Sequence, residues 1–302
     1  MKIEQLNKCT VCPNNCNVNR NNGQKGICNL SDEIKIAMVS KHYYEEPPIS
    51  GTKGSGTIFF SHCNLNCIYC QNYDISANQN GKIVSIRDLA NIMLEQQSQG
   101  VHNINLVTPT MYAYQIIEAI KIAKANGLKI PIVYNTNGYE SVKTIKDLNG
   151  YIDIYLTDLK YSDNNLSKEY SNVNKYFDVT TQAIKEMQKQ INKIVIDKDG
   201  IMQKGIIIRH LILPNAINNT KNVLNWIKEN NKENTIISIM SQYFPSYKAK
   251  QITKLNRKIT KQEYEEIENY LFKLNLENGY IQDYSEDNEE EYVPDFKSWY
   301  NN

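Results

Sequence analysis

Three cysteines lie close together in the stretch SHCNLNCIYCQN, and their spacing suits a metal centre. Cys63, Cys67 and Cys70 follow a C-x3-C-x2-C pattern. Three thiolates cannot pair into an even set of disulfides. They are also one sulfur short of the four that a closed zinc site or a fully ligated iron–sulfur cluster requires. The stretch therefore indicates a metal centre with one open coordination position.

A second group of cysteines near the start of the chain is large enough to close a metal site completely. Its spacing is C-x2-C-x3-C-x11-C, formed by Cys9, Cys12, Cys16 and Cys28. Gly23 and Gly26 allow the chain to turn back and deliver the last of these thiolates. We expect a second bound metal here, either a tetrahedral zinc ion or an iron–sulfur cluster, and the sequence does not choose between them.

Composition limits the classes of partner and compartment. The 302 residues include 34 Lys and Arg and 33 Asp and Glu, for a net charge of +1. This balance argues against a surface for nucleic-acid phosphates or anionic lipid. The first residues lack a secretory apolar region, and no apolar run has membrane-spanning length. All seven cysteines lie at or before Cys70, which indicates metal ligation in a reducing compartment. We expect a cytoplasmic protein that binds neither nucleic acid nor membrane.

Six short apolar runs predict the strands that position the cysteine loop and the polar residues discussed next. They lie at 56–61, 104–109, 131–138, 151–160, 205–214 and 235–240. Helical spacing follows each run except the first, where the cysteine loop comes between, and one long helical stretch is expected up to about Gln190. Ser85 with Asp88 and Thr260 with Glu263 predict capped helix starts. This alternation predicts an α/β fold, an open partial (β/α)6 barrel with a parallel sheet and right-handed crossovers.

The chain divides into three expected parts. Residues 1–55 form a cysteine-rich metal-binding segment with one strand at 34–39. Residues 56–280 form the barrel, and residues 281–302 form a tail whose acidic run at 286–291 is interpreted as a solvated surface.

Polar residues stand at the ends of the expected strands, where barrels of this kind place their chemistry. Arg209 and His210 also interrupt the otherwise apolar fifth strand, and interior polar groups need partners. Converging on one face with a metal loop, the strand ends predict a cofactor pocket. The strand-end residues are Thr108, Thr110, Asn135, Asn137, Asp158, Lys160 and Gln242.

The cysteine loop after the first strand resembles the signature of the radical S-adenosylmethionine superfamily, including the aromatic Tyr69 before the last cysteine. The resemblance implies that Cys63, Cys67 and Cys70 hold three irons of a [4Fe-4S] cluster. The amino and carboxylate groups of S-adenosylmethionine would chelate the fourth iron. Such enzymes cleave the sulfonium carbon–sulfur bond with one electron, release methionine and form a 5′-deoxyadenosyl radical that abstracts hydrogen from a second substrate.

Shorter motifs are similar to those of pyruvate formate-lyase activating enzymes and their activating-enzyme-like relatives. They are CQN, NTNG, DLK, EEPPISG and GSGTIFF. The resemblance implies that Asp158 and Lys160 contact the methionine end of the cofactor, and Asn135 and Asn137 its ribose region. The chain departs from the pattern twice. Thr108-Pro109-Thr110 replaces the usual Gly-Gly-Glu, leaving threonine hydroxyls and carbonyls to accept the amino group, and Ser241-Gln242-Tyr243 replaces a late histidine.

The resulting hypothesis is a radical enzyme that abstracts hydrogen from a protein or peptide, such as a glycyl-radical enzyme, with electrons from flavodoxin or ferredoxin. Two alternatives are modification of a small molecule and a non-catalytic iron–sulfur electron carrier or sensor. A structural zinc site that borrows His62 as its fourth ligand is a further interpretation of the cysteine loop, but it leaves the polar strand ends unexplained.

Overall fold

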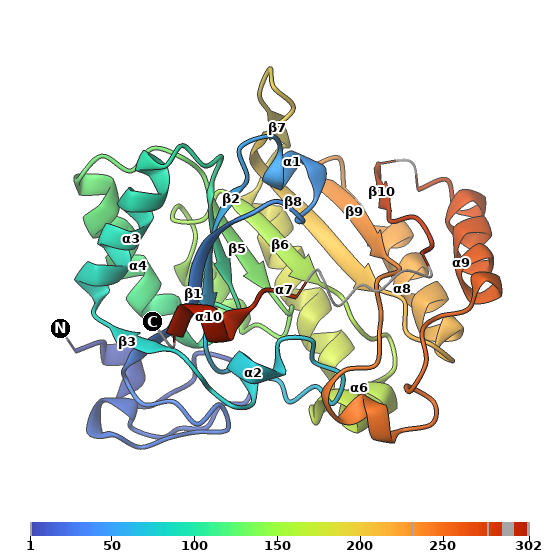
Figure 1. The fold of residues 1–302 in the computed structure, drawn as a ribbon, viewed down its shortest axis with the longest axis horizontal. Helices are drawn as coiled ribbons and strands as arrows, with labels where there is room; N and C mark the ends of the chain where they lie inside the picture. The colour runs from blue at the N-terminus through green and yellow to red at the C-terminus, as the bar shows by residue number, and fades with distance from the viewer. Residues whose placement is uncertain (1, 231, 277, 286–292, 301–302) are drawn as a thin grey trace.

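The structure is a computed structural model that describes residues 2–230, 232–276, 278–285 and 293–300. Its centre is one large sheet with helices packed around it (Figure 1). The strand order is β10-β9-β8-β6-β5-β4-β2-β1-β3. The acidic run expected at 286–291 lies outside the described residues.

Six neighbouring strands are parallel and confirm the expected α/β fold. Each lies within a few residues of its predicted range because the apolar, β-branched runs are buried in the sheet. They are β2 (Ser55–Phe60), β4 (Ile104–Val107), β5 (Ile132–Thr136), β6 (Ile154–Asp158), β8 (Met202–Leu211) and β9 (Thr235–Met240).

Further strands extend the sheet at both edges. At one edge, β1 (Ile34–His42) pairs antiparallel with β2, and β3 (Lys82–Val84) pairs antiparallel with β1. At the other, β10 (Gly279–Ile281) runs parallel to β9. A two-residue strand, β7 (Val195–Ile196), pairs with β8. The cysteine-rich segment thus contributes the strand expected at 34–39, which is longer than predicted and belongs to the main sheet.

Helices follow most strands along the chain. The longer ones are α3 (Ile86–Ser98), α4 (Ala113–Ala125), α5 (Val142–Asp147), α6 (Asn164–Ser171), α7 (Tyr176–Gln190), α8 (Ile217–Asn230) and α9 (Lys261–Lys273). Both predicted capping boxes are present, at the starts of α3 and α9. The single helical stretch expected up to about Gln190 is wrong. It divides into α6 and α7 because Asn172 and Lys175 both adopt left-handed backbone conformations.

The shortest α-helices in the described part of the chain are α1 (Pro47–Ser50), α2 (Tyr73–Ser76) and α10 (Phe296–Tyr300). The last of these lies beside β1 (Figure 1), where Phe296 makes an edge contact with Phe59.

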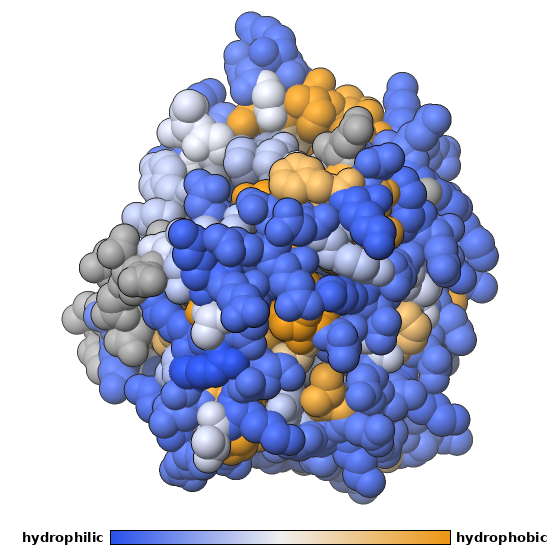
Figure 2. Space-filling view, turned by 90° about the vertical axis from the view of Figure 1, so that its right-hand side faces the viewer, coloured by the Kyte–Doolittle hydropathy of each residue, from blue (hydrophilic) through white to orange (hydrophobic). Residues whose placement is uncertain are grey.

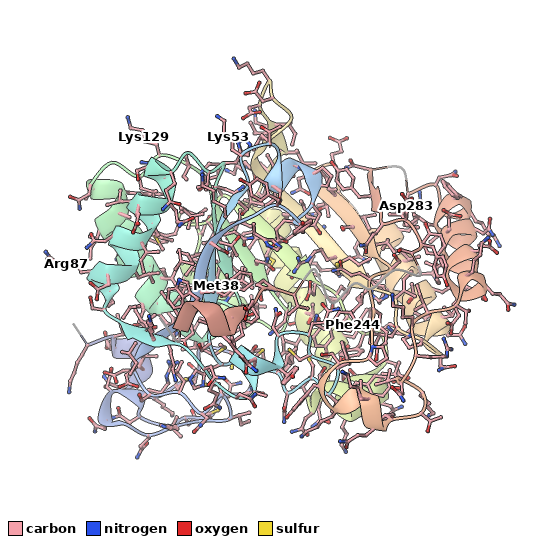
Figure 3. The ribbon with its side chains drawn as sticks, viewed as in Figure 1. Met38, Lys53, Arg87, Lys129, Phe244 and Asp283 are labelled. Carbon is pink, nitrogen blue, oxygen red and sulfur yellow. The ribbon has the colours of Figure 1, made fainter. Side chains whose placement is uncertain are left out.

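The face that carries α9 is mainly hydrophilic, with separate apolar patches (Figure 2). Lys53, Arg87 and Lys129 project outward from the molecule (Figure 3). Among the described residues, no helix combines the length and the apolar character needed to cross a bilayer.

Candidate functional site

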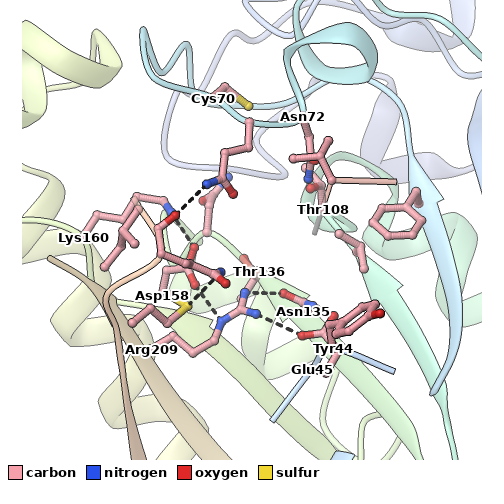
Figure 4. Close-up of a pocket in the computed structure, with 18 of the residues that line it drawn as sticks. Tyr44, Glu45, Cys70, Asn72, Thr108, Asn135, Thr136, Asp158, Lys160 and Arg209 are labelled. Atoms are coloured by element: carbon pink, nitrogen blue, oxygen red, sulfur yellow. Dashed lines mark hydrogen bonds and ion pairs between the residues drawn. The ribbon is translucent and has the colours of Figure 1, made fainter. Parts of the chain in front are cut away.

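A cavity of about 520 Å³ opens at the carboxyl ends of the parallel strands. Its volume falls in the usual range for sites that bind cofactors or small molecules. The structure brings together most of the residues that the sequence predicted: the cavity is lined by Cys63, Cys67, Tyr69, Cys70, Thr108, Asn135, Asn137, Asp158, Lys160 and Gln242 (Figure 4). Thr110 is not among the lining residues.

The three cysteines of the central loop share this cavity, and polar groups contact each sulfur. The backbone amide of Leu65 and the side-chain amide of Asn137 each donate to Cys63 Sγ over 3.4 Å. Cys67 Sγ lies 2.9 Å from the Ser171 hydroxyl oxygen. Cys70 Sγ lies 3.2 Å from the hydroxyl oxygen of Ser76. Each of the three sulfurs thus has a neighbouring group that can donate a hydrogen bond to a thiolate.

Burial raises the pKa of all three thiols, and it raises that of Cys67 to about 11. Without a cation the sulfurs therefore keep their protons at neutral pH. A bound metal must displace these protons, which couples its affinity to pH. Three thiols grouped in one cavity fit an iron–sulfur cluster with an open iron, since the chemistry of such clusters requires sulfur ligands.

A network of charged side chains faces the cysteines across the cavity (Figure 4). Lys160 Nζ lies 2.5 Å from Asp158 Oδ2, and Arg209 Nε donates to Asp158 Oδ1 over 3.0 Å. Burial alone would raise the pKa of Asp158, but Lys160 and Arg209 outweigh it and hold the pKa below its usual range. Asp158 is therefore an ionised carboxylate between two cations.

Glu45 extends this network from the segment between β1 and α1. Its carboxylate accepts from Arg209 Nη1 over 3.2 Å and from the side-chain amides of Asn105 and Asn135 over 2.9 and 3.1 Å. Arg209 Nη2 in turn donates to Asn135 Oδ1 over 2.6 Å. The neighbouring Glu46 also lines the cavity, and its Oε2 has no hydrogen-bond partner. This side of the cavity thus carries two acids that the sequence did not assign to the site.

The NTNG turn after β5 fits tightly against the end of β6. Gly138 has a φ of +81°, and a Cβ at this position would collide with the Asp158 carbonyl oxygen. Tyr176 spans the same junction, donating its hydroxyl to the Asn137 carbonyl over 2.6 Å. The glycine is therefore required for the close approach of the two strand ends that carry Asn137 and Asp158.

The Thr108-Pro109-Thr110 segment divides its two threonines between different environments. Thr108 lines the cavity and adopts a φ of +59°, a conformation in which glycine is more usual. Thr110 is fully buried, and its hydroxyl donates to Glu140 Oε1 over 2.6 Å. The expectation that Thr110 contacts the cofactor is therefore not supported, because this hydroxyl is already engaged beneath the cavity.

Two other predicted residues have clear positions. The Tyr69 hydroxyl lies 2.7 Å from that of Tyr161, which lies 2.6 Å from the hydroxyl of Ser171, the neighbour of Cys67. Tyr69 thus buttresses the cysteine loop as well as lining the cavity. Gln242 also lines the cavity beside the cysteine loop, where its backbone carbonyl accepts from the side chain of Gln71 over 3.3 Å.

Two polar residues of the fifth predicted strand face different surroundings. Arg209 enters the charged network. His210 is fully buried, with Nδ1 2.6 Å from the Leu159 carbonyl oxygen and Nε2 2.9 Å from the Thr220 hydroxyl oxygen. The alternation of side chains along a strand could have predicted that Arg209 and His210 face opposite sides of the sheet, so that only one of them can face the cavity.

The second set of cysteines lies beside the central loop. Cys9, Cys12, Cys16 and Cys28 line one small cavity. The structure thus brings these four residues together, and a metal bound by them remains a prediction.

Comparisons with known proteins place the chain in a family. A family model described as the radical SAM superfamily matches residues 57–202. The uncharacterized protein MJ0674 of Methanocaldococcus jannaschii is 32% identical over 273 residues, covering 87% of this chain and 73% of that protein. The uncharacterized protein MJ0808 of the same organism is 22% identical over 261 residues, covering 80% of this chain and 72% of that protein.

Solved structures align with parts of the chain. A radical SAM methyltransferase from Sphaerobacter thermophilus aligns with a TM-score of 0.52 and 11% identity, covering 76% of this chain and 67% of that chain. Streptococcus suis SuiB bound to S-adenosylmethionine aligns with a TM-score of 0.49 and 16% identity, covering 74% of this chain and 48% of that chain. The chain thus spans about half the length of SuiB. The family match, together with the cysteine loop at the end of β2, shows that the chain belongs to the radical SAM superfamily.

Proposed function

We propose that this protein binds a [4Fe-4S] cluster through Cys63, Cys67 and Cys70, cleaves S-adenosylmethionine reductively and abstracts hydrogen from a protein or peptide. One observation carries the proposal. Three thiols and an ionised Lys160–Asp158–Arg209 network line the same cavity of about 520 Å³. An electron carrier has no use for a charged cavity beside its cluster, whereas an enzyme that binds a zwitterionic cofactor needs both.

The charged network supports binding of the methionine end of S-adenosylmethionine. Lys160 would bind the carboxylate, and Asp158 would accept from the amino group. The hydroxyl or carbonyl of Thr108, which lines the same cavity, offers a further acceptor. When bound, the cluster supplies the electron that breaks the sulfonium carbon–sulfur bond. Hydrogen bonds to charged groups contribute about 1.5–3 kcal/mol each, so these contacts can fix the orientation of the cofactor.

The polar strand ends support binding of the rest of the cofactor. Asn135 and Asn137 would contact its ribose, and Tyr69 and Gln242 would pack against it from the lining of the cavity. Asn137 also donates to Cys63 Sγ, so one side chain would touch both the cluster ligand and the cofactor. The reducing electron must come from a low-potential donor, flavodoxin or ferredoxin, because clusters of this type work at the reducing end of their range.

The outer part of the cavity favours a protein or peptide substrate. Its lining continues past the charged network to Tyr44 and Tyr280, which are 68% and 38% exposed. Exposed aromatic rings next to an open cavity are suited to packing against a peptide chain. A glycyl-radical enzyme is one substrate of this class.

The substrate class can be tested by asking which candidate substrates accelerate the cleavage of S-adenosylmethionine. Reconstituted, reduced protein is incubated anaerobically with S-adenosylmethionine and with candidate proteins encoded by neighbouring genes, and 5′-deoxyadenosine is quantified. A true substrate should accelerate its formation, and deuterium placed in that substrate should appear in the 5′-deoxyadenosine. Acceleration by metabolites alone, with no protein or peptide active, would contradict the proposed substrate class while leaving the cleavage reaction intact.

A further inference from the structure

The four N-terminal cysteines surround a cavity of about 10 Å³, and the remaining lining includes Arg20, Gly26 and Met111. This volume corresponds to about one water-sized sphere. The central cavity is some fifty times larger and shares none of these lining residues. The N-terminal thiols thus have room for one ion between them and little room for a cube of irons and sulfides.

Arg20 gives this cavity a buried positive charge. The side chain is 1% exposed, its Nε donates to the Ser31 carbonyl over 2.7 Å, and its Nη1 donates to the Met111 carbonyl over 2.8 Å. Its Nη2 finds no hydrogen-bond partner in the described part of the chain. Among the residues that the structure describes, no carboxylate forms an ion pair with Arg20. A buried guanidinium costs several kcal/mol unless negative charge lies nearby.

The backbone packs closely around these thiols. The amide of Ile27 donates to Cys16 Sγ over 3.4 Å, and the amide of Asn17 donates to the Cys9 carbonyl over 2.9 Å. A Cβ at Gly26 would lie 2.7 Å from Cys16 Sγ, so only glycine fits beside this sulfur. In the described part of the chain, no three His, Cys, Asp or Glu side chains yet converge as closely as a bound ion demands. Binding must therefore draw the thiolates closer together.

We propose that Cys9, Cys12, Cys16 and Cys28 form a closed site for a single tetrahedral ion of the zinc class, with Arg20 as its counter-charge. Four thiolates around a divalent ion carry a net charge of −2, which the guanidinium partly offsets. The unpaired Nη2 of Arg20 would then donate to a thiolate sulfur. The site has no open position, so its role is structural.

Direct hydrogen bonds join this site to the central cysteine loop. The Cys28 carbonyl oxygen lies 2.9 Å from Nδ1 of His62, and the side chain of Asn14 donates to the Asn64 carbonyl over 2.9 Å. His62 has a φ of +68°, directly before Cys63. A non-glycine residue keeps such a conformation only where its surroundings hold it. His62 is therefore a positioning residue through which the zinc site fixes Cys63, a statement that rests on the proposed cluster at the central loop.

Metal analysis of the full chain tests the single-ion site independently of the central cluster. The Cys63→Ala/Cys67→Ala/Cys70→Ala variant should retain one zinc per chain. Replacing Cys9, Cys12, Cys16 and Cys28 with Ala should remove it. About four irons and four sulfides on the variant that lacks the central cysteines would contradict a single-ion site, as would zinc that survives loss of the N-terminal four.

Zinc affinity, measured by competition with a chromogenic chelator, tests whether Arg20 acts as the counter-charge of the bound ion. Arg20→Met should weaken zinc binding roughly tenfold to a hundredfold, since a hydrogen bond from a charged donor is lost. Arg20→Lys should retain most of the affinity. If Arg20→Met does not fold, Gly26→Ala tests the same cavity, because its methyl group crowds Cys16, and Gly23→Ala is the control with nothing within 4 Å. Equal zinc affinity in Gly26→Ala and Gly23→Ala, or in Arg20→Met and wild type, would overturn the proposal.

The link to the central loop has a spectroscopic test. His62→Ala should change the EPR spectrum of the reduced central cluster while one zinc stays bound. His62→Asn should restore the spectrum, because asparagine tolerates a positive φ and carries an amide donor for the Cys28 carbonyl. An unchanged spectrum in His62→Ala would contradict the positioning role without affecting the zinc site or the proposed reaction.

Discussion

At the scale of single residues, the cavity concentrates charge where a zwitterionic cofactor needs it. Asp158 and Lys160 could be predicted from sequence because they end an apolar run in a short polar motif. Glu45 and Glu46 could not, because the loop that carries them lies far from the strand ends in sequence and reaches the cavity only through the antiparallel strand β1. Arg209 was visible as a polar residue in an apolar strand, but its partners Asp158 and Glu45 emerge only from the fold.

Replacement of Lys160 tests the contact proposed for the methionine carboxylate. Lys160→Met keeps an aliphatic stem and removes the charge, so binding of S-adenosylmethionine to the cluster-loaded protein should weaken by about 1.5–3 kcal/mol, roughly tenfold to a hundredfold. Equilibrium binding measured anaerobically provides the affinity. Lys129→Ala serves as the control, since this side chain projects from the surface (Figure 3). Equal affinities for Lys160→Met and wild type would exclude the contact.

Glu140 should make the stability of the protein depend on pH. Its carboxylate is fully buried beneath the cavity, accepts from Thr110 and Thr136, and has a pKa that burial raises to about 7. Between about pH 4.5 and 7 the folded protein keeps this proton, whereas the unfolded chain releases it. The free energy of unfolding should therefore fall as pH rises across this interval, by roughly 3 kcal/mol.

Glu140→Gln carries no titrating proton and should remove this contribution. Thermal unfolding of wild type and variant between pH 5 and 7.5 measures the difference. The wild type should lose stability relative to Glu140→Gln as pH rises. A constant difference between the two proteins across this range would show that Glu140 is ionised throughout.

At the scale of elements, the six central strands could be predicted from the sequence and the shortest strands could not. The six central strands are mainly apolar runs, and burial on both faces makes such runs distinct in sequence. The strands β3, β7 and β10 were missed because each has three residues or fewer, and pairing with a neighbour determines them more than their own composition. The α6–α7 junction was missed because left-handed Asn172 and Lys175 interrupt a continuous helical pattern without proline or glycine.

The junction of β5 and β6 offers a matched pair of glycine substitutions. Gly138 and Gly150 have nearly equal φ angles, +81° and +84°, but of the two only Gly138 has atoms within 4 Å of the position that a Cβ would take, including the Asp158 carbonyl oxygen. Gly150→Ala should cost about 1–2 kcal/mol of unfolding free energy from its left-handed backbone. Gly138→Ala should cost about 1–3 kcal/mol more, since its methyl group must displace backbone. Equal losses in denaturant unfolding would contradict the close packing of the two strand ends.

At the scale of the whole molecule, residues far apart in sequence enclose one cavity. Val293 and Pro294, from the segment expected to be a tail, line the cavity together with residues of β2 and β8. Phe296 anchors this segment: it is 3% exposed and lies 5.2 Å from Phe59, measured between ring centroids. Sequence alone could not foresee this contact, because a short helix after an acidic run carries no periodic signal of its own.

Loss of the Phe296 ring should release the end of the chain from β1. Phe296→Ala should lower the free energy of local unfolding of this segment by about 3–5 kcal/mol. The amide hydrogens of α10 should then exchange faster than in wild type. Phe272→Ala is the control because that ring is 66% exposed. Hydrogen exchange read by mass spectrometry gives the comparison. Unchanged exchange over residues 293–300 in Phe296→Ala would mean that other contacts hold the segment in place.

The central claim is that Cys63, Cys67 and Cys70 hold a cluster whose open iron activates S-adenosylmethionine. The most direct test is chromatographic detection of 5′-deoxyadenosine and methionine after anaerobic incubation of reconstituted protein with S-adenosylmethionine and dithionite. Wild type should release the two products in equal amounts, slowly without a second substrate, and the variant with all three cysteines replaced by Ala should release neither. Wild-type protein with a full complement of cluster iron that forms no 5′-deoxyadenosine with dithionite or reduced flavodoxin would contradict the claim.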